Sequence, residues 1–253
     1  MPLRPDRIVL VCATGTEVGK TWVAANLLEE LRGRGLGVAA RKPAQSFDVD
    51  REANSIGEHT DADVLGEASG EPPEVVCLPA RSYHRAMAPP MAAEVLGLPP
   101  FTVGDLAGEL RWPEPAADVG VVESAGGVRS PQASDGDVVD LGRLLRPEVV
   151  LLVADAGLGT INGVRLSVSA LSPLTVDEPH VGRPGGGPAR LLVALNRFDE
   201  DHDLHRRNLR WLADRDGLEV VTAPGGAGRL ADLVLEGPRT LPGVGSPGRG
   251  RTP

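Results

Sequence analysis

Short apolar runs alternate along the chain with segments whose apolar residues recur at helical spacing. Within residues 20–34, Val23, Leu27, Leu28 and Leu31 fall on one face of a helix. The runs DVGVVE and VVLLVA are largely apolar without alternation, which is typical of strands covered on both faces of a parallel sheet. The pattern therefore predicts an α/β protein with a doubly wound, mainly parallel sheet and helices on both faces.

The same pattern places the individual elements. Strands are predicted over residues 8–12, 38–41, 118–123, 149–154, 191–195 and 218–221. Helices are predicted over residues 20–34, 61–69, 92–96, 103–110, 160–171, 204–215 and 230–235. We expect residues 1–236 to form a single domain with a flexible insertion near residues 177–188, which includes VGRPGGGP. Residues 237–253 are rich in Gly and Pro and are expected to be a disordered tail.

The loop after the first strand carries candidate chemistry. Residues 13–21 read ATGTEVGKT, between the apolar run RIVLVC and the first helix. The pattern G-x-x-x-x-G-K-S/T would need glycine at position 14, but the chain has Thr14 there and a glycine at Gly15. Backbone N–H groups and the helix dipole favour phosphate at such a place. Lys20 could reach the β and γ phosphates and Thr21 could bind Mg²⁺, so nucleotide binding is favoured over a ligand-free turn.

Composition and charge narrow the possible partners. Lysine and arginine total 26, but Lys20 and Lys42 are the only lysines, which leaves 24 arginines. A functional role is favoured over chance retention for both lysines, because their compact ammonium on a flexible stem cannot be replaced by a planar guanidinium. The net charge of −9 argues against nucleic-acid binding. No apolar run approaches a membrane span, and two distant cysteines indicate neither a disulfide framework nor a metal cluster. We expect a cytoplasmic protein that acts on small molecules.

Several segments resemble those of one enzyme family. The loop is similar to G-T-x-T-x-V-G-K-T of the dethiobiotin synthases, with Ala13 at the leading glycine. RKPAQS at 41–46 resembles K-P-V-x-S/T, and AMAPPMAAE at 86–94 resembles a proline-containing segment near the substrate. ESAGG at 123–127 and DAGLGTIN at 155–162 resemble E-G-A-G-G and L-G-T/C-I/L-N. These matches follow the family's order from about residue 8 to residue 200. Together they resemble a dethiobiotin synthase with the P-loop NTPase fold.

The resemblance implies an ATP-dependent closure of a cyclic urea from 7,8-diaminononanoate and CO₂, in biotin biosynthesis. It implies that Lys42 holds the carbamate and Lys20 the transferring phosphoryl group. Ser46 would help to bind the diamine or its carbamate. The nucleotide would lie against Thr16, Glu17, Val18, Gly19, Lys20, Thr21 and, at its adenine, Asn196. Gly159 and Asn162 would bind the substrate carboxylate across the interface of a homodimer.

A magnesium site is expected beside the phosphates, since Mg²⁺ takes a few hard oxygen ligands from protein. Thr21, Asp61 and Glu123 suit that role. Asp63 competes with Asp61, although spacing from the Ser-Gly pair at 69–70 favours Asp61. Asp61 could instead be an N-cap or first-turn acid of the helix at 61–69. Burying Glu123 at a strand end would be costly without a charged partner.

The match departs from the family at three positions in its substrate half. Phe47 and Ser124 replace glycines of the family, and Gly163 stands where histidine is common. A paralogous ATPase or ligase acting on another amine or carboxylate is therefore an alternative. A ParA- or MinD-like ATPase switch should carry an additional loop lysine and a basic surface, and the sequence has neither. The cobyrinate-amidating relatives need a glutaminase domain with a nucleophilic cysteine, which the sequence also lacks.

Overall fold

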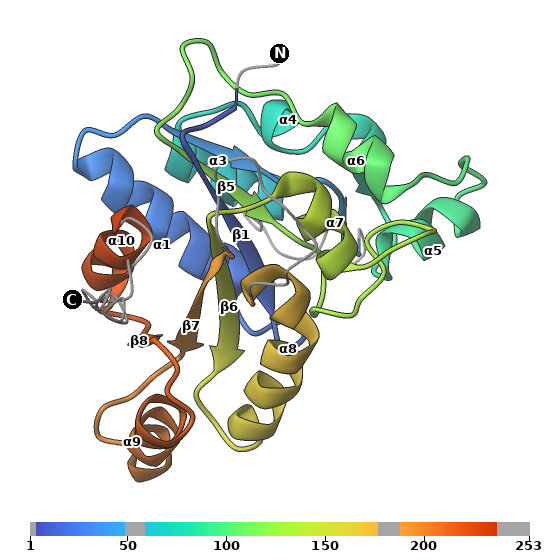
Figure 1. Ribbon diagram of the computed structural model, residues 1–253. Coiled ribbons are helices and arrows are strands. Elements are labelled where there is room, and N and C mark those ends of the chain that lie inside the picture. The colour runs from blue at the N-terminus through green and yellow to red at the C-terminus, as the bar shows by residue number, and fades with distance from the viewer. Residues whose placement is uncertain (1–3, 49–58, 177–187, 237–253) are drawn as a thin grey trace, which may run out of the picture.

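The main sheet has six parallel strands, and helices cover both of its faces (Figure 1). The computed structural model describes residues 4–48, 59–176 and 188–236. In spatial order the strands are β2 (Val38–Arg41), β5 (Val119–Glu123), β1 (Arg7–Ala13), β6 (Val149–Asp155), β7 (Arg190–Asn196) and β8 (Val220–Thr222). Every neighbouring pair is parallel. The predicted α/β class and parallel sheet are confirmed.

The central strand β1 shows why each face needs a helical layer. Successive side chains of a strand point to opposite faces. Val9 and Val11 accordingly lie in one apolar core, and Ile8, Leu10 and Cys12 lie in the other. The first core is closed by α1 (Lys20–Gly33), α3 (Asp61–Ser69) and α10 (Ala227–Leu235). The second is closed by α5 (Pro89–Val95), α6 (Val103–Glu109), α7 (Val138–Leu145) and α8 (Thr160–Thr175). Figure 1 shows α1 and α10 on one side of the sheet and α7 and α8 on the other.

The remaining elements are short. They are α4 (Pro73–Val76), η1 (Pro79–Arg81) and α9 (Asp203–Arg210), which continues as the π-helical turn η2 (Trp211–Arg215). A second, two-stranded sheet pairs β3 (Gln45–Ser46) with β4 (Ser82–Tyr83) in parallel. This pairing holds the segment after β2 beside the segment that leads to α5.

The predicted strands match the observed ones to within two residues at each end, as do the helices predicted at 20–34, 61–69 and 103–110. Other boundaries were wrong. Helix α5 begins at Pro89 instead of residue 92, because prolines suit the first turn of a helix. Helix α8 continues across Pro173 to Thr175, and α10 begins at Ala227. The helix predicted over 204–215 changes to π-helical geometry at Trp211. Helices α4 and α7 and the β3–β4 sheet were not predicted.

Two expectations fall largely outside the described residues. The flexible insertion near 177–188 overlaps them only at residue 188, and the tail at 237–253 lies outside them entirely. Across the described ranges, no helix is both long and apolar enough to cross a membrane.

Candidate functional site

The segments that follow β1, β2, β5 and β7 meet around a pocket of about 530 Å³. Ligands of open α/β sheets bind at this place, outside the carboxyl ends of the strands. The predicted site residues that line it are Thr16, Glu17, Gly19, Lys20, Thr21, Lys42, Ser46 and Asp61. Lining residues that were not predicted are Gln45, Ala125, Gly126 and Arg197. Most of the predicted site therefore comes together in one chain.

The loop before α1 leaves the start of the helix open to an anion. Gly19 precedes the helix with φ of 87°, a left-handed conformation that suits glycine. A Cβ at Gly19 would collide with Nδ2 of Asn196, which donates to the carbonyl of Val18 at 2.9 Å. Among the described residues no side chain caps α1, and its first turn contains no acidic residue. Its free N–H groups and the buried Lys20 thus favour a phosphate here.

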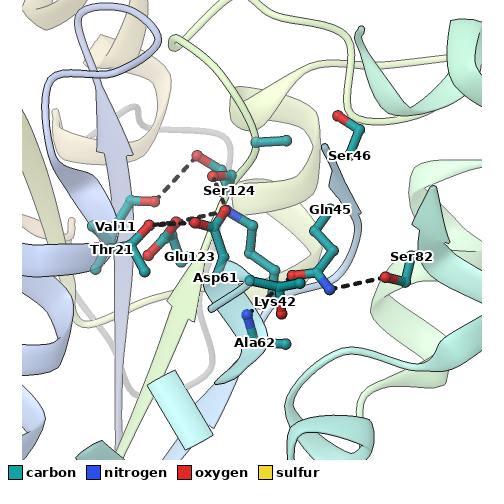
Figure 2. A network of polar contacts seen from close by, with 12 residues as sticks. Val11, Thr21, Lys42, Gln45, Ser46, Asp61, Ala62, Ser82, Glu123 and Ser124 are labelled. Atoms are coloured by element: carbon teal, nitrogen blue, oxygen red, sulfur yellow. Dashed lines mark hydrogen bonds and ion pairs between the residues drawn. The ribbon is translucent and has the colours of Figure 1, made fainter. Parts of the chain in front are cut away.

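Lys42, directly after β2, is the centre of a polar network (Figure 2). Its Nζ lies 2.7 Å from Oδ2 of Asp61 and 2.6 Å from Oε1 of Glu123, and it donates to the carbonyl of Ser124 at 3.3 Å. The hydroxyl oxygen of Thr21 lies 2.8 Å from Oδ1 of Asp61 and 2.9 Å from Oε1 of Glu123. The single hydroxyl hydrogen can serve only one carboxylate at a time. The network joins residues from β5, α1, α3 and the end of β2.

The charges in this network shift one another's protonation. Burial alone would lower the pKa of Lys42, but the charges and hydrogen bonds of Asp61 and Glu123 raise it above its ordinary 10.5. For Lys20, burial and the charge of Lys42 lower the pKa. Burial raises the pKa of Glu123 against the opposing charge of Lys42. Burial would also raise the pKa of Asp61, but Lys42 holds it below 3.8. Lys42 is thus firmly cationic, and Lys20 loses its proton more readily.

The residues expected to hold Mg²⁺ fit that ion. Glu123 is fully buried, and its Oε2 has no hydrogen-bond partner within the described part of the chain. Such an oxygen is costly to bury unless a cation or donor meets it. The neighbouring Thr21 hydroxyl and Asp61 carboxylate complete a set of hard oxygens suited to Mg²⁺. No cluster of three or more His, Cys, Asp or Glu that could hold a metal occurs in the described ranges. Mg²⁺ at phosphates takes only one or two carboxylates, so a smaller set is sufficient.

Two acids in the first turn of α3, Asp61 and Asp63, make different contacts. Thr60 is the N-cap, and its backbone N–H donates to Oδ2 of Asp63 at 2.8 Å. The N–H of Asp63 donates in return to the Thr60 hydroxyl at 3.3 Å, which completes a capping box. Asp61, the first helical residue, instead turns its carboxylate to Lys42 and Thr21. The geometry therefore favours Asp61 over Asp63 as the acid in the pocket.

Comparison with known proteins identifies the family. The chain is 34% identical over 227 residues to the ATP-dependent dethiobiotin synthetase BioD of Rhodococcus jostii, covering 88% of this chain and 89% of that protein. It is 39% identical over 223 residues to the enzyme of the same name from Anaeromyxobacter dehalogenans, covering 85% and 89%. This chain belongs to the dethiobiotin synthetase family. The sequence profile of the AAA domain family also matches residues 7–177.

One solved structure supports the fold alone. A plasmid partition protein from Borrelia burgdorferi superposes with a TM-score of 0.50 at 13% identity, covering 91% of this chain and 96% of that protein. The likeness supports the α/β fold described above. At this identity it carries no information about activity.

Two of the departures from the dethiobiotin synthetase motifs are accommodated locally. The N–H and hydroxyl of Ser124 both donate to the carbonyl of Val11, at 3.0 and 3.1 Å, so the additional hydroxyl is satisfied in the core. Phe47 packs edge-on against His84, with ring centroids 4.8 Å apart. It follows Ser46, whose hydroxyl donates to the carbonyl of Met87 at 2.6 Å. The segment after β2 is thus tied to the segment before α5, beside the pocket.

The residues expected from the family at the substrate carboxylate lie elsewhere. Gly159 is the residue before α8, with φ of 91°, and Asn162 lies in the first turn of that helix. Neither lines the pocket of about 530 Å³. A Cβ at Gly163 would make ordinary van der Waals contact with Thr14, so the glycine is not required by a collision at the Cβ position.

Sequence reasoning missed side chains whose roles depend on tertiary contacts. Gln132 is buried, accepts from the N–H of Ala125 at 2.9 Å and donates to its carbonyl at 2.7 Å, which fixes the loop after β5. Gln45 accepts from the N–H of Ala62 at 3.0 Å and so ties β3 to α3. Nothing in the local sequence marks Gln132 or Arg197 as part of a site. The capping box of α3 was readable, because Thr60 and Asp63 have T-x-x-D spacing.

Proposed function

We propose that this chain is an ATP-dependent cyclo-ligase that makes dethiobiotin from 7,8-diaminononanoate, CO₂ and ATP. One observation carries the proposal beyond family membership. The ammonium of Lys42 is held between Asp61 and Glu123 in the pocket that also contains Lys20 at the start of α1. The pocket thus contains two ammonium groups. Lys20 belongs to the loop of residues 13–21, called the phosphate loop below, and Lys42 lies beside that loop, where a second anion could bind.

The reaction needs positive charge more than a protein nucleophile. One amine of the substrate attacks CO₂ and loses a proton, which gives a carbamate. A carbamate oxygen attacks the γ-phosphorus of ATP, and ADP leaves. The second amine then attacks the carbamate carbon, loses a proton and expels phosphate, which closes the urea ring. Phosphoryl transfer of this kind is mostly positioning and charge neutralisation.

The chain's own residues then take distinct roles. Lys20 and the N–H groups at the start of α1 would hold the transferring phosphoryl group. Lys42 would bind the carbamate oxygens, since its raised pKa keeps it charged. Ser46 would contact the diamine or its carbamate from β3. The remaining nucleotide contacts would come from Thr16, Glu17, Val18, Gly19, Thr21 and Asn196.

The buried Oε2 of Glu123 supports a divalent cation as part of this site. Thr21, Asp61 and Glu123 would hold Mg²⁺, which supplies charge neutralisation at the β and γ phosphates. Lys42 forms ion pairs with Asp61 and Glu123, so its ammonium also offsets the negative charge of these two carboxylates.

We further propose one domain over residues 1–236, a homodimer and a cytoplasmic location, where ATP is available. The dimer is supported by the position of Gly159 and Asn162, outside the pocket of their own chain. Leu158 and Leu166 nearby are 92% and 65% exposed, which suits a surface covered by a second copy. In such a dimer the start of α8 could reach the partner's pocket.

The direct test measures ATP consumption with Mg²⁺ and bicarbonate, with and without 7,8-diaminononanoate, and examines the product by mass. Stimulation by the diamine together with a cyclic urea product is expected. If the chain binds ATP but the diamine does not stimulate ATP consumption, this acceptor is wrong and another amine is the substrate. The replacement of the family's glycine by Phe47, beside Ser46, would agree with that result.

Two lysine variants separate the proposed roles. Lys20→Ala should weaken both nucleotide binding and turnover, because the phosphate loop loses its cation. Lys42→Arg should bind ATP nearly as well as the unaltered chain but lose turnover, because a planar guanidinium cannot replace the compact ammonium held between Asp61 and Glu123. Equal loss of ATP binding in the two variants would reject this division of labour.

A further inference from the structure

Arg197 lies directly after Asn196 at the end of β7, and its side chain lines the pocket. Its φ is 54°, a left-handed conformation that arginine seldom adopts. Glu17 in the phosphate loop has a similarly uncommon φ of 60°. The two residues are joined, because Nη2 of Arg197 donates to the carbonyl of Glu17 at 2.7 Å. Unusual backbone at both ends of one hydrogen bond often marks a functional place.

Arg197 and Asn196 together hold two consecutive carbonyls of the loop. Asn196 binds the carbonyl of Val18 and Arg197 binds that of Glu17, at 2.9 and 2.7 Å. A loop that cradles phosphate must present its N–H groups to the ligand, while a carbonyl turned to the ligand would repel it. Donors that hold these carbonyls favour the orientation that accepts phosphate.

Asp155, the last residue of β6, fixes the arginine in turn. Its Oδ2 lies 2.8 Å from Nη1 of Arg197, and its Oδ1 accepts from the N–H of Gly157 at 2.8 Å. Each carboxylate oxygen therefore has its own donor, and the guanidinium is held by Asp155 on one side and by Glu17 on the other. Since Gly157 belongs to the segment that leads into α8, the contact also connects the phosphate loop with that segment.

We propose that Arg197 is a positioning residue for the nucleotide, which acts with Asp155 to hold the phosphate loop in its ligand-accepting orientation. The inference rests on the proposed function only in taking a nucleoside triphosphate as the ligand. The guanidinium acts through the carbonyl of Glu17. Removing Asp155 therefore has the same kind of effect as removing Arg197.

The test compares binding of a non-hydrolysable ATP analogue by calorimetry in Arg197→Ala, Asp155→Asn and the double variant of the full chain. Arg197→Ala is expected to weaken binding about tenfold, and Asp155→Asn about threefold. The double variant should be no weaker than Arg197→Ala alone, because both changes remove one coupled arrangement. Arg197→Lys should fail to rescue, since one ammonium cannot reach both partners in the geometry of a planar fork.

Steady-state kinetics give a second readout, in which the KM for ATP rises while kcat and the KM for the amine stay near those of the unaltered chain. The matched control is Arg207→Ala on α9. It breaks an exposed ion pair, in which Nε of Arg207 lies 2.6 Å from Oδ2 of Asp203, and neither residue lines the pocket. It should bind the analogue like the unaltered chain.

Three results would overturn the inference. Loss of binding in Arg197→Ala with none in Asp155→Asn would mean that the guanidinium contacts the nucleotide directly. An Arg197→Ala variant that binds like Arg207→Ala would mean an ion pair without influence on the loop. Failure of the unaltered chain to bind the analogue would overturn the proposed function as well, so the two failures are distinguishable.

Discussion

Lys20 and Lys42 line the same pocket, but their amino groups meet opposite electrostatic conditions. Lys20 lies at the start of α1, where burial and the charge of Lys42 lower its pKa. For Lys42, burial acts in the same direction, but Asp61 and Glu123 outweigh it and raise its pKa. A lowered pKa increases the neutral, nucleophilic fraction of an amine at a given pH, and a raised pKa decreases it. The more reactive lysine is therefore the one at the phosphate loop.

This difference predicts the order of chemical modification. With an amine-acylating reagent at about pH 9, below the reference pKa of lysine, Lys20 should react before Lys42. An ATP analogue should protect Lys20. Mass spectrometry of peptides can follow both sites without ambiguity, because the chain contains no other lysine. Acylation of Lys42 ahead of Lys20 in the folded chain would contradict the assigned directions of the two pKa shifts.

At the scale of single elements, the first turn of α3 contains two acids with different contacts. Asp63 forms the capping box with Thr60, and Asp61 forms an ion pair with Lys42 in the polar network. Asp63→Ala should therefore lower the free energy of unfolding by about 1 kcal/mol and leave Mg²⁺ affinity unchanged. Asp61→Ala should reduce the affinity for Mg²⁺ with ADP, because a carboxylate of the site is lost. Urea unfolding and calorimetry measure the two effects.

Glu67→Gln, an exposed acid on the same helix, is the control and should change neither quantity. The assignment would be wrong if Asp63→Ala impaired Mg²⁺ binding and Asp61→Ala did not.

The elements that could be predicted are those whose own residues determine them. VVLLVA is apolar throughout because β6 is buried on both faces, so its strand was visible in the sequence. Helix α7 was missed because VVDLGRLL is short and contains Gly142, which lies where a Cβ would press on Leu174. The strands β3 and β4 have two residues each, and their pairing depends on the tertiary fold. Such strands leave no periodic signal.

The site divides in the same way. The phosphate loop and Lys42 follow strands, Glu123 ends one, and all three carry recognisable local motifs, so they were predictable as members of one site. Arg197 was not, because its partners Asp155 and Glu17 are distant in sequence and its conformation follows from their contacts. The spacing from the Ser-Gly pair favoured Asp61 over Asp63, and the T-x-x-D spacing of Thr60 and Asp63 is a second local signal, because it is that of a capping box with Thr60 as the N-cap.

For the whole molecule, the pocket brings most of the residues proposed to bind phosphate together within one chain. Lys20, Lys42 and Asp61 line it together, and Glu123 is joined to them through its ion pair with Lys42. Gly159 and Asn162 at the start of α8 do not line it. The proposed two-fold dimer would explain this, because an isologous interface can place the start of α8 of each chain at the other chain's pocket.

The dimer can be tested by mixing two inactive variants. In Lys42→Arg the chain's own pocket is damaged, and in Asn162→Ala the damage falls on the partner's pocket. After unfolding and joint refolding, each mixed dimer should contain one intact site, made from Lys42 of one chain and Asn162 of the other. Random pairing makes half the dimers mixed, so about a quarter of all sites and of the normal activity at low diamine concentration should return.

Mixing Lys42→Arg with Lys20→Ala is the control and should restore nothing, because both residues line the pocket of the same chain. Absence of recovery in the first mixture would place Asn162 outside a shared site. Recovery in the control would contradict the placement of Lys20 and Lys42 in the pocket of one chain.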